Sequence, residues 1–232
     1  MRRLVLAPAL AALAVLAPSV HAAAPAPQVV DPAGDANGGA NEAATSDKAL
    51  PAGNQAYADV VSVLWQATKK TSVVKGKKVT NVTGFTVTAT LSGPPTPPSG
   101  TTVVYRMLGA TPNCGFFGVA YYTSKGSDPT QPQSAIRDNC NGTPTRLTAI
   151  ALPVIAGNTI TWTVPLTAIP KDTKVKLGSK ITGLWFEVRE IEDFHGVCVP
   201  DDGGTTGYGG ACGLGVGALD NSPVGDATFA IA

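Results

Sequence analysis

An acidic segment near the N-terminus carries the side chains best suited to hold a metal ion. Residues 31–38 read DPAGDANG, which places Asp31, Asp35 and Asn37 at positions 1, 5 and 7 of a tight, glycine-containing loop. Calcium takes about six to eight oxygen ligands from carboxylates, amides and main-chain carbonyls. Asp59, at the start of a predicted strand, can supply a further carboxylate. The loop is not an EF-hand, because its third position is alanine. An ordinary turn with solvated carboxylates is the alternative.

The cysteines are the second group of reactive side chains, at positions 114, 140, 198 and 212. An even number of cysteines in an exported chain is typical of disulfides. Four cysteines allow three connectivities. We favour Cys114–Cys140 and Cys198–Cys212, because each pair closes a local loop rich in glycine or asparagine. A metal site built from these cysteines is disfavoured, because the chain has no CxxC motif.

Acidic residues around His195 raise the possibility of acid–base chemistry. Glu190 and Asp193 precede this histidine closely, and such groups serve hydrolases. A general-acid pair, however, needs two carboxylates placed across a cleft, and the chain has no GxSxG nucleophile elbow. We therefore expect a solvated strand end and a non-catalytic protein, with a secreted hydrolase as an alternative.

Aromatic and basic residues indicate where a ligand or partner can bind. Tyr121, Tyr122 and Tyr208 are candidates for stacking on a ligand such as a glycan, whereas the three tryptophans lie in predicted strands and are expected in the core. Neighbouring residues of a strand point to opposite faces, so one of Tyr121 and Tyr122 must face outward. Residues 69–78 (KKTSVVKGKK) predict a charged hairpin that either contacts an anionic cell-wall polymer or is simply solvated.

The first 22 residues have the pattern of a secretory signal peptide. Two arginines precede an apolar stretch, and Val20-His21-Ala22 ends it with small residues suited to cleavage. We therefore predict an extracellular, secreted protein. The 17 basic and 16 acidic residues nearly balance, which argues against a nucleic-acid partner. No later apolar segment is long enough to span a membrane, and we expect a monomer.

These groups must be positioned by β-strands, because apolar residues alternate with polar ones along most of the chain. The clearest case is 84–92, where Phe85, Val87, Ala89 and Leu91 alternate with threonines. We predict about ten strands, at 28–31, 59–66, 84–92, 101–108, 116–123, 134–137, 145–151, 158–164, 181–189 and 227–231. No helix is predicted beyond one short turn at 166–169. The pattern predicts an all-β, mainly antiparallel β-sandwich over 57–232, preceded by a loop-rich segment at 23–56.

Several short motifs resemble secreted β-sandwich domains related to carbohydrate-binding module family 9 and the DOMON-like domains. They are DPAGDANG followed by YADVVSV, the stretch 159–170 (TITWTVPLTAIP), 183–189 (GLWFEVR), and DNSP before the final strand. The resemblance implies a sandwich fold, of immunoglobulin-like or jelly-roll type. It also implies a structural calcium site at Asp31, Asp35, Asn37 and Asp59. A carbohydrate-binding module that recognises an extracellular polysaccharide is the alternative function.

Overall fold

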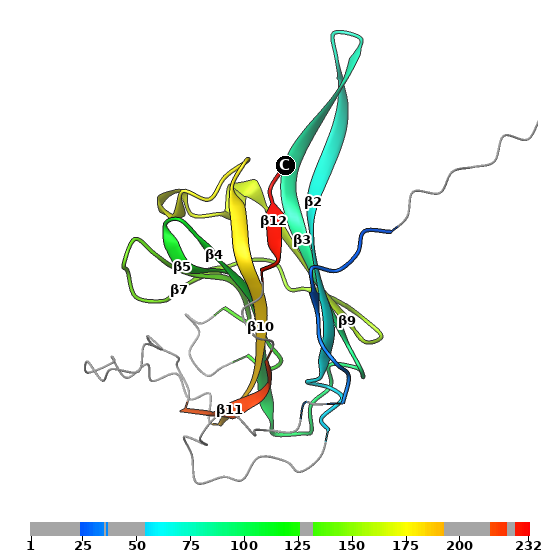
Figure 1. Ribbon diagram of the computed structural model, residues 1–232, viewed down its shortest axis with the longest axis vertical. Helices are drawn as coiled ribbons and strands as arrows, with labels where there is room; N and C mark the ends of the chain where they lie inside the picture. Colours follow the sequence, from blue (N-terminus) through cyan, green and yellow to red (C-terminus); the bar gives the residue numbers. More distant parts are fainter. Residues whose placement is uncertain (1–23, 35, 37–53, 126–131, 193–213, 222–225) are drawn as a thin grey trace, which may run out of the picture.

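The protein is an all-β sandwich of two antiparallel sheets, as the alternating sequence predicts (Figure 1). A computed structural model describes residues 24–34, 36, 54–125, 132–192, 214–221 and 226–232. Cys198, Cys212, Tyr208, Asp193 and His195 lie outside the described residues, as do Asp35 and Asn37. The signal peptide prediction also falls outside them.

The smaller sheet has five strands and the larger has seven. In spatial order the smaller sheet contains β1 (Val29–Val30), β2 (Val60–Val74), β3 (Lys77–Leu91), β9 (Thr159–Pro165) and β8 (Val154–Ala156). The larger contains β11 (Leu214–Asn221), β10 (Lys180–Glu192), β4 (Thr102–Thr111), β5 (Cys114–Tyr122), β6 (Ser134–Cys140) and β7 (Arg146–Ala149), and β12 (Thr228–Ala230) also pairs with β10. Two 3-10 turns, η1 (Leu166–Ala168) and η2 (Lys171–Thr173), follow β9.

Each of the ten predicted strands has a counterpart, and the turn before Pro170 is η1. Two strands were not predicted from the sequence. β8 is only three residues long, and β11 contains glycines that weaken the alternating signal. The described part of the chain contains no helix with the length and hydropathy needed to cross a bilayer.

The core lies between the sheets and is rich in aromatic side chains. Trp65, Phe85 and Trp162 from the smaller sheet are almost completely buried. Phe85 lies at the centre, with ring centroids 5.7 Å from Trp65, 5.8 Å from Phe229 and 6.4 Å from Phe117. Trp185 is half-buried instead. Such aromatic contacts bury large apolar areas and join the two sheets.

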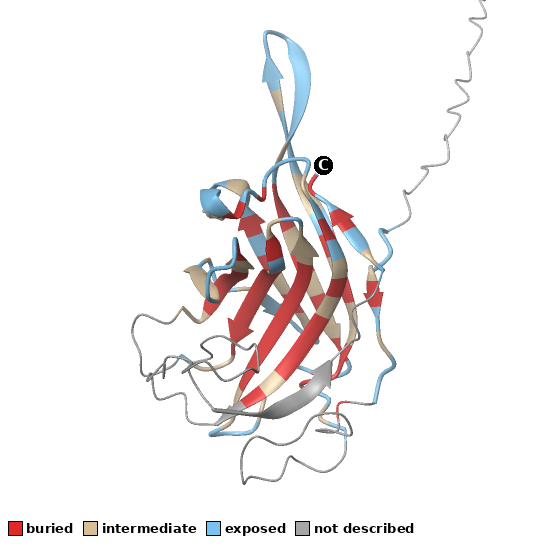
Figure 2. Cartoon of the chain, turned by 60° about the vertical axis from the view of Figure 1, so that its left-hand side comes forward, coloured by how far each residue is buried: buried red, intermediate tan, exposed pale blue. Residues whose placement is uncertain are grey.

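One hairpin extends beyond the sandwich. β2 and β3 are each 15 residues long, and their pairing continues to Val74 and Lys77 at the tip. Only part of each strand is shared with the rest of the sheet, because β9 pairs with β3 from Gly84 to Thr90 and no further. The remaining part projects as a two-stranded ribbon (Figures 1 and 2). The predicted charged hairpin is therefore a continuation of two core strands.

Candidate functional site

The predicted metal-binding segment and Asp59 lie together at one end of the smaller sheet. β1 pairs with β2 through Val29–Val63 and Val30–Ser62, and the backbone N–H of Asp31 donates to the Val61 carbonyl. The chain then turns at Gly34, whose φ of 100° suits glycine. The backbone N–H of Gly34 donates to Asp59 Oδ2 at 2.7 Å. The short strand before the loop thus holds the loop against the start of β2.

The Asp59 carboxylate is buried, yet it is only half satisfied. Its Oδ2 accepts three hydrogen bonds, from Gly34 N–H, from Asn54 Nδ2 at 3.0 Å and from Ser92 Oγ at 2.7 Å. The residue is 0% exposed, and among the residues that the structure describes its Oδ1 has no hydrogen-bond partner. Within the described residues no lysine or arginine forms an ion pair with it. A buried carboxylate oxygen without a partner is costly, and a cation is the group that best satisfies it.

Two of the four predicted ligands, Asp31 and Asp59, are therefore described and lie on adjoining segments. Asp35 and Asn37 lie outside the described residues. In the part of the chain that the structure describes, no three histidine, cysteine or acidic residues form a metal-binding group. The residues present fit a calcium ion through carboxylate and main-chain oxygens, which are the ligands that calcium prefers.

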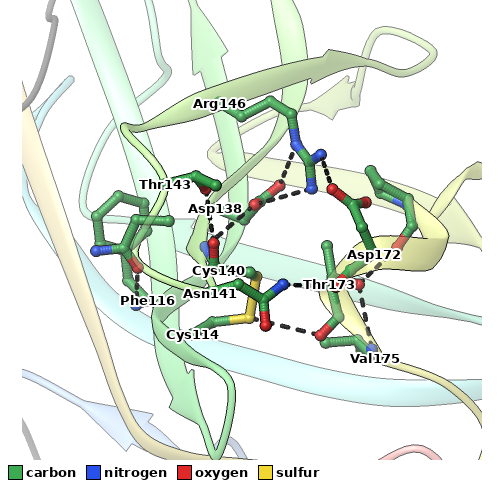
Figure 3. Close-up of a disulfide and its surroundings, with 12 residues drawn as sticks. Cys114, Phe116, Asp138, Cys140, Asn141, Thr143, Arg146, Asp172, Thr173 and Val175 are labelled. Carbon is green, nitrogen blue, oxygen red and sulfur yellow. Dashed lines mark hydrogen bonds and ion pairs between the residues drawn. A yellow bond between two sulfur atoms is a disulfide. The ribbon is translucent and has the colours of Figure 1, made fainter.

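The predicted bond between Cys114 and Cys140 is present and closes one corner of the larger sheet (Figure 3). The two cysteines are cross-strand partners in β5 and β6. Beside them, Arg146 donates to both oxygens of the buried Asp138, at 3.2 and 3.0 Å, and also pairs with the exposed Asp172. The hydrogen bond from Arg146 lowers the pKa of Asp172 below its usual range. This corner fastens η2 to the sheet and has a structural role.

A second charged group lies on the larger sheet, on the face opposite the core. Arg106 Nη1 donates to Glu187 Oε2 at 2.6 Å, and Arg189 Nε donates to the other oxygen of that carboxylate. Arg106 and Glu187 are direct partners in the β4–β10 register, and both are buried. Burial alone raises the pKa of Glu187, but Arg106 and Arg189 outweigh it, so the pKa lies below its usual value.

Arg137 belongs to the same face, and within the described residues no carboxylate hydrogen-bonds to it. Its guanidinium lies 5.2 Å from the centre of the Phe116 ring and hydrogen-bonds to the Tyr122 side chain. Burial, and then the positive charge of Arg106, lowers the pKa of Arg137 to about 10. Arg137 therefore stays charged at neutral pH. Among the side chains that the structure describes, this charged group consists of Arg106, Arg137, Arg189 and Glu187. Figure 2 shows that buried residues follow several neighbouring strands of the sheet.

The two described tyrosine candidates lie on opposite faces of the larger sheet. Tyr121 lies inside the sandwich, stacked on Tyr105 with ring centroids 6.3 Å apart, whereas Tyr122 is on the outer face. Glu190 is buried and near Tyr57, whose pKa is raised by burial and by this carboxylate. Glycan binding through Tyr121, Tyr122 and Tyr208 stays a prediction, as does the alternative of hydrolysis.

The pairing of Arg106 with Glu187 was not predicted from the sequence. The expectation of a solvated strand end before His195 is wrong for Glu187 and Glu190, because both are buried. The signal for the pairing was present in β4 (TVVYRMLGAT), where one arginine interrupts an apolar stretch. Apolar residues on both faces there indicate a strand buried on both sides, so a charge in its middle requires a partner across the strands. The partner, Glu187, is 81 residues away, and pairing at that distance cannot be read from one strand.

Comparisons with protein-family models, with curated proteins and with solved structures found no match to this chain.

Proposed function

We propose that this chain is an exported, non-catalytic binding protein whose β-sandwich is stabilised by a calcium ion near its N-terminus. The observation that carries the proposal is the completely buried Asp59 carboxylate, whose Oδ1 lacks a partner beside the loop that begins at Asp31. Asp31, Asp35, Asn37 and Asp59 are the proposed ligands. The ion neutralises carboxylates that otherwise repel one another.

The proposed ion has a mechanical role. The N-terminal segment is held to β2 by the two-residue strand β1 and by a few hydrogen bonds, such as that from Gln28 Nε2 to the Trp65 carbonyl. A strand this short contributes little by itself. An ion that bridges the loop and Asp59 would fix the segment over the open end of the sandwich, and with it the edge of β2.

The test is thermal unfolding of the oxidised protein in excess calcium and in EDTA. A ligand bound only by the folded state at 100 times its dissociation constant adds about 2.7 kcal/mol. For a domain of this size that corresponds to a rise in Tm of roughly 5 to 10 °C. Asp59→Asn and Asp31→Asn should each abolish the rise, whatever they do to the Tm in EDTA.

Asp226→Asn is the matched control, because Asp226 is exposed and precedes β12. It should retain the full calcium-dependent rise. An equal rise in all four proteins would show that calcium acts elsewhere, and no rise in the unmodified protein would overturn the proposal. Magnesium should give a smaller rise, since it demands a stricter octahedral geometry.

A further inference from the structure

The hairpin ribbon that projects from the sandwich carries several positive charges close together. We define the arm as residues 69–82, which begin at a register shift between Thr68 and Lys69. All its residues are exposed except Ser72 and Val82, which are half-buried. It carries five exposed lysines and no acidic residue. These lysines are Lys69, Lys70, Lys75, Lys77 and Lys78.

The positive charge of the arm has no acidic residue near it in the sequence. The sequence contains no aspartate or glutamate at all from residue 60 to residue 127. Among the residues that the structure describes, none of the five lysines forms an ion pair. The whole chain is nearly neutral, at a formal +1, so the arm concentrates positive charge on one projection. One lysine would suffice to protect a strand edge from pairing, and five without a counter-charge exceed that need.

The arm is also built to hold its shape without a core. Its ladder pairs Lys70 with Asn81 and Val74 with Lys77, and the Thr71 and Thr80 hydroxyls lie 2.9 Å apart across the strands. Lys75 and Gly76 form the two-residue turn, with φ values of 49° and 76°, as in a type I′ hairpin. At about 3.3 Å per residue, the six residues from Lys69 to Val74 reach roughly 20 Å from the sandwich.

The distribution of the lysines indicates an extended partner. Lys69 and Lys70 lie at the base of the arm, and Lys75, Lys77 and Lys78 lie at its tip. At physiological salt, charges interact over only about 8 Å, so a flat surface touching the tip would not engage the base. Consecutive residues of a strand also face opposite sides, which places a lysine on each face at both ends. A flexible chain lying along the arm can reach all five.

We infer that the arm binds an extended polyanion of repeating phosphate groups. All five of its charges are lysines, which bind phosphate as point charges, and the arm has no arginine to form the paired hydrogen bonds that a planar carboxylate accepts. The exposed valines of the arm are Val73, Val74 and Val79. Val73 and Val74 are consecutive and so face opposite sides, and the three form no one-sided apolar face of the kind that inserts into a bilayer. Because this inference names a partner for the proposed binding role, it rests on that proposal.

The experiment measures binding of long-chain inorganic polyphosphate to the oxidised protein over a series of salt concentrations. By analogy with single-stranded polyanions, five lysine contacts give a log K against log salt slope of about −3.5. The triple variant Lys75→Gln, Lys77→Gln, Lys78→Gln should make the slope shallower by about 2. Lys171→Gln, Lys176→Gln, Lys180→Gln removes the same charge from sites outside the arm and should bind as the unmodified protein does.

Three further measurements decide between partners. Val73→Thr, Val74→Thr should leave polyphosphate binding unchanged, and vesicles with anionic lipid should bind far more weakly than polyphosphate. Polygalacturonate, a carboxylate polymer, should also bind more weakly. Preference for vesicles or for polygalacturonate, equal losses in the two lysine variants, or an unaltered slope in the arm variant would each overturn the inference. The calcium-dependent rise in Tm, measured on the arm variant, tests the calcium site separately, because the residues that hydrogen-bond to Asp59 all lie outside the arm.

Discussion

Replacing Glu187 by glutamine should destabilise the protein strongly, because two arginines share this one carboxylate. Glu187 is 6% exposed, and both Arg106 and Arg189 contact it. Glutamine keeps the shape but removes the charge, so the buried Arg106 loses the carboxylate with which it forms an ion pair. Breaking a buried pair in this way costs about 3 to 5 kcal/mol. Because Arg189 is more exposed than Arg106, we expect the lower half of that range.

The assay is equilibrium unfolding of the oxidised protein in urea at pH 7, repeated down to pH 3. The pKa of Glu187 in the fold lies below its usual value of 4.5. Its contribution is therefore complete above the unfolded-state pKa and is lost as the pH falls through the lower, folded-state value. The Glu187→Gln protein should accordingly lose less stability than the unmodified protein over this acid range.

Two controls separate the charge effect from a general packing effect. Adding Arg106→Gln to Glu187→Gln removes both partners, and the double variant should be less destabilised than the sum of the single variants. Asp172→Asn breaks the exposed ion pair with Arg146 and should change stability far less. A loss below about 1 kcal/mol for Glu187→Gln, or an acid dependence that the substitution does not change, would refute the reasoning.

Two other predictions concern the larger sheet. Replacing both Cys114 and Cys140 by alanine should cost about 3.5 kcal/mol on the chain-entropy relation, because the bond spans 26 residues; urea unfolding that gives an unchanged midpoint would contradict this. Gly118→Ala should cost about 2 kcal/mol or more, because its Cβ would lie 2.0 Å from the Met107 carbonyl oxygen. Gly115→Ala in the same strand meets only the Asn139 side chain and should be tolerated, so equal effects of the two glycine substitutions would show that the backbone contact is not limiting.

The strands could be predicted most directly where one face of the strand is buried and the other is not, because apolar and polar residues then alternate. In β3, Phe85, Val87 and Ala89 face the core and the intervening threonines do not, so the period of two is visible in the sequence. In β4 and β5 both faces are buried, so apolar residues follow one another and the alternation of apolar and polar residues is weak. The strands there were still identified, but the polar partners on their outer face were not.

The candidate site could be predicted only in part, because some of its contacts follow from a local motif and others depend on which strands lie side by side. Asp59 was identified because it begins a predicted strand and because Asp31, Asp35 and Asn37 form a recognisable loop motif. Its hydrogen bond to Gly34 spans 25 residues and its bond from Ser92 spans 33. The loop motif suggested the first contact, whereas nothing in the sequence indicated the second. The Arg106–Glu187 pair depends wholly on which strands lie side by side, and strand order is a property of the whole fold.

Strand β2 connects the two features that we propose to be functional. Asp59 immediately precedes it, and the arm begins ten residues later at Lys69. At about 3.3 Å per residue these positions are roughly 30 Å apart, several times the screening length at physiological salt. The charge of a calcium ion at Asp59 therefore cannot strengthen binding of a polyanion at the arm by direct attraction. What the ion can do is hold the start of β2 in the sheet, and so fix the direction in which a rigid arm projects.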